Sequence, residues 1–448
     1  MRCLSTHASA FLLCAACAAA AAQVPTAAPA ADPEPLTLTQ ARAQALRNHP
    51  DIAAADYRAQ AQHEVYVQSR AGLLPQVNLY ADAVHAGADD TRLMAGGINN
   101  PSVFTRTALG MGASQLITDF GHTANLAASS RLQAHAAQDV ALTTRAQVLL
   151  AVDHDYFALL QAQAVEAVAR QTLETRQLLL QRVSILAENK LKSDLDVSFA
   201  QVGTEDARLL VQRARSDADS AQANLATVLG YREAHTFVLA DQPADAAAVE
   251  ASAAALVEQA LQDRPELANL RNQRDAAEKL ARSLRDARLP TISAVFDAGN
   301  APTHDARLPD NYSAAGITVS VPLFAGGLYS ARQHEAELRA KAAGEALRTV
   351  EDDVARDVRV AVLTLNSARE RLRTSAQLRR YATTAYELAD ARYRVGSSSI
   401  VELSQAQLAL TSAQLEETAA RYEVLSRAAE LDYQTGATAD AAAQAPGS

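Results

Sequence analysis

Acid–base side chains stand in a row at Asp153, His154 and Asp155, and such a group could in principle bind a metal ion or transfer protons. The surrounding residues argue against this, because they favour a continuous helix. Consecutive residues on a helix point in different directions and cannot converge on one ion. We therefore expect a solvated helix face here, with no metal site, no catalytic site and no cofactor.

The cysteines cannot supply thiol chemistry to the mature protein. Cys3, Cys14 and Cys17 are the only ones, and all lie in a leader that has Arg2 near its start, an apolar run of small residues and Ala-Ala-Ala at residues 20–22. This pattern is typical of a cleaved secretory signal, so we predict a signal peptide at residues 1–22. Lipidation of Cys17 stays an open alternative.

Charge and hydropathy exclude two further classes of protein. The chain carries 41 Lys plus Arg against 51 Asp plus Glu, a formal net charge of −10, which does not fit binding to nucleic acid. After the leader, no apolar run approaches the ~18 residues that would predict a membrane-spanning helix. Any insertion into a membrane must therefore come from strands.

Long helices are predicted in two places. No Pro occurs between Pro101 and Pro243 or between Pro322 and Pro446, and Ala, Leu, Arg, Gln and Glu, which favour helices, dominate these stretches. A helix over residues 122–186 would be on the order of 100 Å long. Its narrow apolar seam indicates side-by-side packing in a coiled coil. A solvated two-helix rod without a lumen fits this local pattern equally well.

An internal repeat organises the chain. Residues 47–52 align with residues 262–267, and further along Gly121 aligns with Gly327 at an offset that stays constant for more than a hundred residues. Constant spacing is expected for long helices, because one inserted residue would rotate everything after it by about 100°. We predict a first repeat at 36–231, a linker at 232–250, a second repeat at 251–436 and a disordered C-terminal tail at 437–448.

Each repeat contains two segments with the period-two pattern of β-strands. They have about ten residues each, the length of a transmembrane β-strand, and predict β-hairpins at about 75–120 and 290–324. Four strands cannot close a barrel, and an open sheet edge in lipid leaves backbone groups unpaired, so the chain must oligomerise to insert. Aromatic residues near the predicted strand ends fit an interfacial girdle: Tyr80, Phe104, Phe120, Phe296, Tyr312 and Phe324.

The order of these elements, and the segment Tyr-Arg-Val-Gly-Ser-Ser-Ser-Ile-Val-Glu-Leu at residues 393–403, resemble the TolC-like outer-membrane factor family. The resemblance implies a mixed α and β membrane protein with a tandem two-fold repeat. Four transmembrane β-strands per subunit would complete a 12-stranded β-barrel in a homotrimer, continued by a long periplasmic α-helical coiled-coil barrel.

The resemblance also implies a function. The chain would be the outer-membrane channel of a tripartite efflux pump or type I secretion system, would contact outer-membrane lipid, and would extend into the periplasm. Its partners would be a periplasmic adaptor protein and an inner-membrane pump of RND, ABC or MFS type; the pump class and the exported substrate stay open. A periplasmic adaptor and a soluble coiled-coil scaffold are the alternatives.

Two helical turns are the candidate gate. Ser193 with Asp196, and Ser399 with Glu402, have the spacing of a capping box, which by itself explains both acids. The resemblance implies a second role, in which Glu402 is an entrance acid and Gln405 occupies the position of another. It also implies that Tyr393 and Asp196 form a hydrogen-bonded pair that helps to hold the entrance shut.

The outermost residues of the two turns are the candidate contacts for an adaptor. By resemblance, Val395, Gly396 and Ser397 match the tip that meets the adaptor in the second turn. The first turn has Asn189 and Lys190 at the matching positions, so the two turns would dock adaptor hairpins unequally. The strength of the closed gate stays open.

Overall fold

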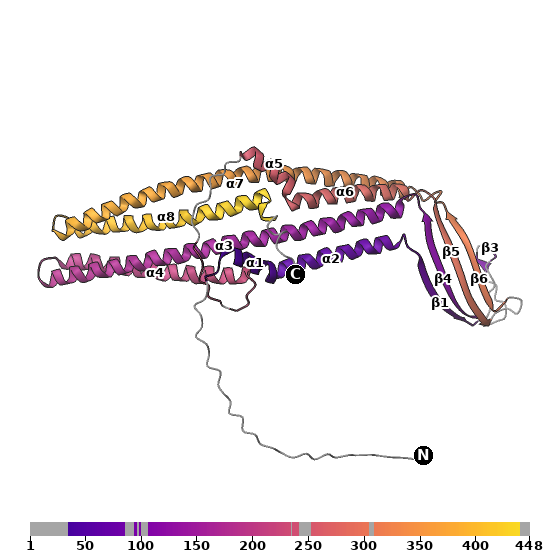
Figure 1. Ribbon diagram of the computed structural model, residues 1–448, viewed down its shortest axis with the longest axis horizontal. Coiled ribbons are helices and arrows are strands. Elements are labelled where there is room, and N and C mark those ends of the chain that lie inside the picture. Colours follow the sequence, from indigo (N-terminus) through magenta and orange to yellow (C-terminus); the bar gives the residue numbers. More distant parts are fainter. Residues whose placement is uncertain are drawn as a thin grey trace, which may run out of the picture.

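The computed structural model describes residues 35–85, 94–95, 98–99, 106–233, 235–241, 252–303 and 309–439. The molecule is elongated, with a bundle of long helices at one end and a sheet at the other (Figure 1). The predicted signal peptide at 1–22 lies outside the described residues, as does Cys17.

The order of elements in the first half of the chain is two short helices, a hairpin and two long helices. They are α1 Leu38–Asn48, α2 Pro50–Ala71, β1 Gln76–Val84, β4 Arg106–Thr118, α3 His122–Glu188 and α4 Asp194–Val228. The second half has the same order. It consists of α5 Ala253–Asp263, α6 Pro265–Asp286, β5 Thr291–Thr303, β6 Asn311–Ser320, α7 Leu328–Arg394 and α8 Ile400–Thr435. Two short strands, β2 Met94–Ala95 and β3 Ile98–Asn99, lie between β1 and β4.

The predicted long helices are confirmed. Helices α3 and α7 have 67 residues each, and α4 and α8 have 35 and 36. Helix α4 packs on α3, α3 on α8, and α8 on α7. Val354, Val358 and Leu365, which lie along one apolar stripe of α7, are buried. Within the described ranges, no helix has a stretch that is both long and apolar enough to cross a membrane.

The largest apolar cluster lies midway along the helices, where α1 meets α3, α4 and α8. Tyr156 is fully buried there, and its hydroxyl donates to the carbonyls of Leu36, at 2.8 Å, and Ala240, at 2.7 Å. Residues 235–241, which belong to the predicted linker, therefore pack on the first half of the chain. The predicted tail at 437–448 begins with three helical residues, of which Thr438 and Ala439 are buried, and the rest lies outside the described residues.

The sheet has four antiparallel strands in the order β1-β4-β5-β6, so the two predicted hairpins are confirmed and β4 pairs with β5 across the two halves. Strand β5 has 13 residues and ends at Thr303. Strand β6 ends at Ser320, short of the predicted Phe324, because Pro322 has no N–H to donate to a ladder.

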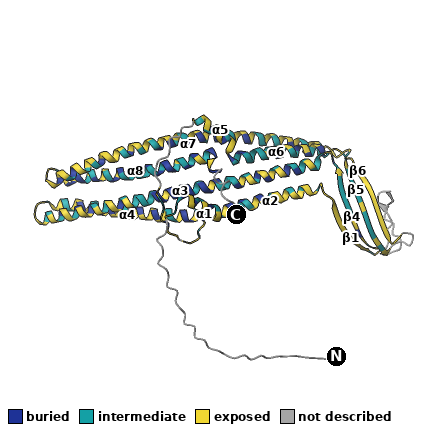
Figure 2. Ribbon diagram, viewed as in Figure 1, coloured by how far each residue is buried: buried dark blue, intermediate teal, exposed yellow. Residues whose placement is uncertain are grey.

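The register separates the sheet into two faces. Leu79 pairs with Met111, which pairs with Ala298. A second cross-strand row lies on the same face and consists of Val77, Ala113, Phe296 and Ala315. Leu79 is 75% exposed, and Figure 2 shows exposed residues along β1 and β6. One face is therefore apolar and exposed, as in strands that meet lipid.

The opposite face is polar and rich in glycine. Tyr80 pairs with Gly110, Gly110 with Gly299, and Gly299 with Tyr312, and the Tyr80 hydroxyl donates to Asp297. A Cβ added at Gly110 would lie 3.1 Å from the Tyr80 ring, so glycine leaves room for the rings to cross neighbouring strands. The predicted girdle role is wrong for Tyr80 and Tyr312, because alternation places them on the polar face. Phe104 lies outside the described residues.

Candidate functional site

Two turns form the end of the molecule furthest from the sheet (Figure 1). The first joins α3 to α4 and the second joins α7 to α8. Gly396 in the second turn has φ +77°, and Lys190, at the matching position of the first turn, has φ +62°. The two turns therefore have the same backbone shape, although a lysine adopts the left-handed region only at a cost of about 1–2 kcal/mol.

The two turns differ in how their acids are used. In the first, the predicted capping box is confirmed: Asp196 accepts from the Ser193 N–H at 3.0 Å, and the Ser193 hydroxyl accepts from the Asp196 N–H at 3.3 Å. In the second, Ser399 accepts from the Glu402 N–H at 3.2 Å, but the Glu402 carboxylate accepts from Arg392 at 2.8 Å. A charge-assisted bond is stronger than a bond to a neutral N–H, so the second box is only half formed.

Tyr393 lies in an apolar cluster that unites the two helical hairpins. Its side chain is 2% exposed, and it packs with residues of all four long helices: Leu179, Val183, Ala200, Ala389, Ile400 and Leu403. Burial, and then the negative charge of Asp196, raise the pKa of Tyr393. The structure thus brings Tyr393 and Asp196 close together.

The hydrogen bond implied for this pair is not formed in the protomer. The Tyr393 hydroxyl is buried without a hydrogen-bond partner among the described residues. The Asp196 carboxylate is engaged by Ser193 instead, at 2.9 Å from its hydroxyl. The ammonium group of Lys192 lies 4.2 Å above the Tyr393 ring.

The sequence did not predict an ion-pair link between the two helical hairpins. The Asp390 side chain on α7 is 15% exposed and lies 2.5 Å from Arg394 and 3.5 Å from Arg182, which is on α3. The spacing of Asp390 and Arg394 along one helix signals a pair. No sequence pattern connects either of them to Arg182.

The predicted entrance and tip residues are accessible. Gln405 is exposed on α8 and lines a cavity, while Glu402 is partly exposed. Val395 is 79% exposed, and a Cβ at Gly396 would meet nothing within 4 Å. Ser397 donates to the Arg392 carbonyl at 3.1 Å.

The first turn adds apolar surface to this end of the molecule. Leu191 is 70% exposed and Leu195 is 65% exposed, beside the exposed Asn189 and Lys190. The Asn189 side chain is occupied locally, because it donates to the Ile185 carbonyl at 2.7 Å. Exposed apolar residues with a polar surround are typical of a docking surface.

The predicted solvated face at Asp153 and His154 is wrong. Asp153 is 1% exposed and receives two bonds from Arg42 on α1, at 2.6 and 2.5 Å. His154 contacts Ser426 at 2.6 Å and Glu430 at 3.3 Å, both on α8. Burial raises the pKa of the Asp153 carboxyl, and Arg42 opposes that rise. Asp153 and His154 therefore join α3 to α1 and α8, a role that depends on which elements pack against α3.

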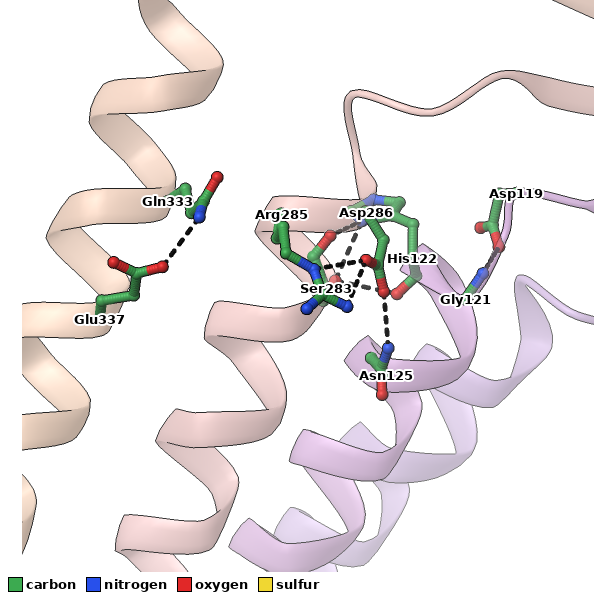
Figure 3. A network of polar contacts seen from close by, with 9 residues as sticks. All are labelled: Asp119, Gly121, His122, Asn125, Ser283, Arg285, Asp286, Gln333 and Glu337. Atoms are coloured by element: carbon green, nitrogen blue, oxygen red, sulfur yellow. Dashed lines mark hydrogen bonds and ion pairs between the residues drawn. The ribbon is translucent and has the colours of Figure 1, made fainter.

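His122 takes part in a second polar network, at the junction of helices and sheet (Figure 3). Its Nδ1 lies 2.9 Å from the Ser283 carbonyl oxygen, and the fully buried Ser283 hydroxyl donates to the His122 carbonyl at 2.9 Å. Asn125 donates to Asp286 at 2.9 Å. These bonds fix α3 against α6. In the part of the chain that is described, no three His, Cys, Asp or Glu side chains are placed to hold a metal ion.

Comparison with known proteins gives the family of the chain. The family model described as outer membrane efflux protein matches residues 41–231 and 256–437. Outer membrane protein TolC of Vibrio cholerae serotype O1 is 25% identical over 412 residues, which cover 88% of this chain and 89% of the relative.

Solved structures have the same fold. The outer membrane protein VceC from Vibrio cholerae has a TM-score of 0.76 at 16% identity, with 89% of this chain and 96% of that chain covered. The MtrE outer membrane channel of Neisseria gonorrhoeae, solved in its open state, has a TM-score of 0.75 at 19% identity, with 89% and 88% covered. Two matched regions that together span most of its length show that this chain belongs to the outer membrane efflux protein family.

Proposed function

We propose that this protein is the outer-membrane channel component of a tripartite efflux pump or type I secretion system. It conducts substrates passively across the periplasm and the outer membrane, and its helices extend into the periplasm. The observation that carries the proposal is a sheet with one apolar, exposed face and two unpaired edges, set at the end of helices that are 67 residues long.

Insertion requires other copies of the chain. Strands β1 and β6 are the edges of the sheet, and unpaired backbone groups in lipid cost several kcal/mol each. Closure by three copies gives a 12-stranded barrel in a homotrimer, with the apolar face in contact with outer-membrane lipid.

The charges of the helices support head-to-tail contacts between copies. Helices α4 and α7 are the free edges of the long-helix layer. Helix α4 has six acidic and three basic residues, whereas residues 366–394 of α7 have three acidic and seven basic ones. Complementary edges of this kind make a heterologous interface, which closes into a ring when the rotation allows it.

The tips provide the partner site and the gate. An adaptor docks on the exposed turns, at Val395, Gly396 and Ser397 in one and at Asn189 and Lys190 in the other. The inner-membrane pump, of RND, ABC or MFS type, supplies the energy. The gate opens like an iris when the two hairpins separate, which breaks the contacts around Tyr393, Asp196, Glu402 and Gln405.

Reconstitution tests this function directly. The purified protein is expected to be a trimer that needs detergent for extraction and forms discrete conducting pores in planar lipid bilayers. Analytical ultracentrifugation gives the mass of the assembly, and single-channel recording gives the conductance. A water-soluble monomer without conductance would overturn the proposal in favour of a coiled-coil scaffold or an adaptor.

The link at Asp390 predicts how the gate responds to substitution. Asp390→Asn removes the ion pairs to Arg182 and Arg394 and is expected to weaken the closed state by about 1 kcal/mol per subunit. Because the three subunits open together, the effect adds up to about 3 kcal/mol, and the ratio of open to closed channels in single-channel recordings should rise about 150-fold.

Two controls define this result. Glu370→Gln makes the same charge change on α7 at an exposed pair with Arg373, and should leave the opening frequency unchanged. Tyr393→Phe removes a hydroxyl that has no hydrogen-bond partner among the described residues, so it should also have no effect. Equal opening of Asp390→Asn and wild-type channels would show that Asp390 does not hold the gate.

A further inference from the structure

A buried arginine on α3 has no acidic partner. Arg176 is 8% exposed, and of the residues that the structure describes its guanidinium donates only to Ser404, at 3.5 Å to the hydroxyl and 3.4 Å to the carbonyl oxygen. No carboxylate lies within ion-pair distance of it among the described residues. Arginine has five N–H donors and keeps its charge, so a site with two long, neutral contacts leaves most of its bonding capacity unused.

The chain makes room for this guanidinium. A Cβ at Gly203 on α4 would lie 2.9 Å from Nη1 of Arg176. Burial lowers the pKa of Arg176, and Tyr386 and Asp206 oppose that effect only through space. Asp206 is exposed, and it also lines the cavity described next.

The guanidinium borders a cavity of about 300 Å³ between α4 and α8, with α3 beneath it. Most of the walls are apolar, from Phe199, Val202, Leu210, Val401 and Leu408. Pockets that bind small molecules begin at about 300 Å³ and combine apolar walls with a few polar groups. The cavity is too small for a docked helix of a partner protein, because an α-helix with its side chains is about 10–12 Å wide.

We propose that this cavity binds a small amphiphilic organic anion, with its carboxylate on Arg176 and its apolar part against Phe199 and Leu408. A planar guanidinium matches a carboxylate in a two-bond geometry. The inference rests on the proposed function, because Gln405, which that proposal places at the gate of the channel, also lines the cavity. Amphiphilic carboxylates are therefore a class of cargo that would be retained briefly at the entrance.

Binding can be measured without transport. The probe is 11-(dansylamino)undecanoic acid, titrated by fluorescence against the full-length protein in phosphatidylcholine nanodiscs without detergent. We expect saturable binding that dodecanoate displaces and dodecan-1-ol does not. Arg176→Gln should weaken binding about tenfold or more, because it removes the charged partner.

Two further variants complete the test. Gly203→Ala should also weaken binding, since the added Cβ displaces the guanidinium of Arg176. If Arg176→Gln fails to fold, Gly203→Ala is the variant that tests the inference. Arg208→Gln is the matched control, because Arg208 lies on α4, is exposed and pairs with Glu205. It should bind like the wild type.

The inference is overturned if the probe does not saturate, if dodecan-1-ol competes equally, or if both cavity variants bind like the wild type. Displacement by an acidic helical peptide but not by dodecanoate would assign the cavity to a protein partner instead. Conductance of the same preparation separates the two proposals. A conducting channel that does not bind the probe rejects this inference alone, and a non-conducting protein that binds it rejects only the proposed function.

Discussion

Replacing Arg42 by Gln is expected to lower the free energy of unfolding of the helical region by about 3–5 kcal/mol, because it leaves a buried carboxylate without its partner. Asp153 is 1% exposed and receives both of its short bonds from Arg42. The loss can be measured by guanidinium unfolding of the detergent-solubilised protein, followed by circular dichroism of the helices.

The loss should depend on pH. Burial raises the pKa of Asp153 in the folded protein, and without Arg42 nothing of comparable strength opposes that rise. A carboxyl whose pKa is higher in the folded state than in the unfolded state binds protons on folding, so the variant gains stability as the pH falls. Its deficit should be largest at neutral pH and smaller near pH 5.

Two comparisons identify the cause. Arg47→Gln makes the same charge change on α1 at an exposed position and should cost little. Adding Asp153→Asn to the Arg42→Gln variant should restore part of the stability and remove the pH dependence. A deficit that is the same at every pH would contradict an ionised Asp153 as its source.

Leu79→Lys is expected to oppose insertion of the sheet into lipid by about 2–4 kcal/mol per subunit. Leu79 is central in β1, is 75% exposed and lies on the apolar face with Met111. The yield of trimer refolded into phospholipid vesicles, at increasing guanidinium concentration, measures the effect.

The neighbouring residue supplies the matched control. Asn78→Lys adds the same charge one position away, on the opposite face with Gly112 and Asp297. It should refold with a yield close to that of the wild type. Similar losses for the two variants would mean that the apolar face does not meet lipid.

Regular patterns in the sequence predict most of the fold. A long stretch without Pro, rich in residues that favour helices, predicts α3 to within two residues at each end, and a second such stretch contains α7. Period-two alternation predicts all four strands of the sheet. Both signals are local, because helix and strand side chains repeat every 3.6 and 2 residues. The constant offset of the repeat also matches Lys190 to Gly396, and the structure gives both residues a positive φ.

Contacts between distant elements could not be predicted. Asp153 looks solvated on α3 alone, and it is buried only because α1 brings Arg42 against it. Likewise, the link from Asp390 to Arg182 requires α7 to lie beside α3 near the turns. The sequence offers the Glu402 carboxylate two hydrogen-bond partners, the N–H of Ser399 at the helix cap and the side chain of Arg392. Only the three-dimensional geometry decides that Glu402 bonds to Arg392.

The glycine row beneath Tyr80 and Tyr312 has a consequence for what crosses the outer membrane. In the proposed barrel the polar face is the inner wall, and rings that lie flat over Gly110 and Gly299 leave the bore wide. A larger side chain in that row would tilt the rings toward the axis and narrow the passage. In that proposed barrel, the diameter available to a solute would thus depend on residues that have no side chain.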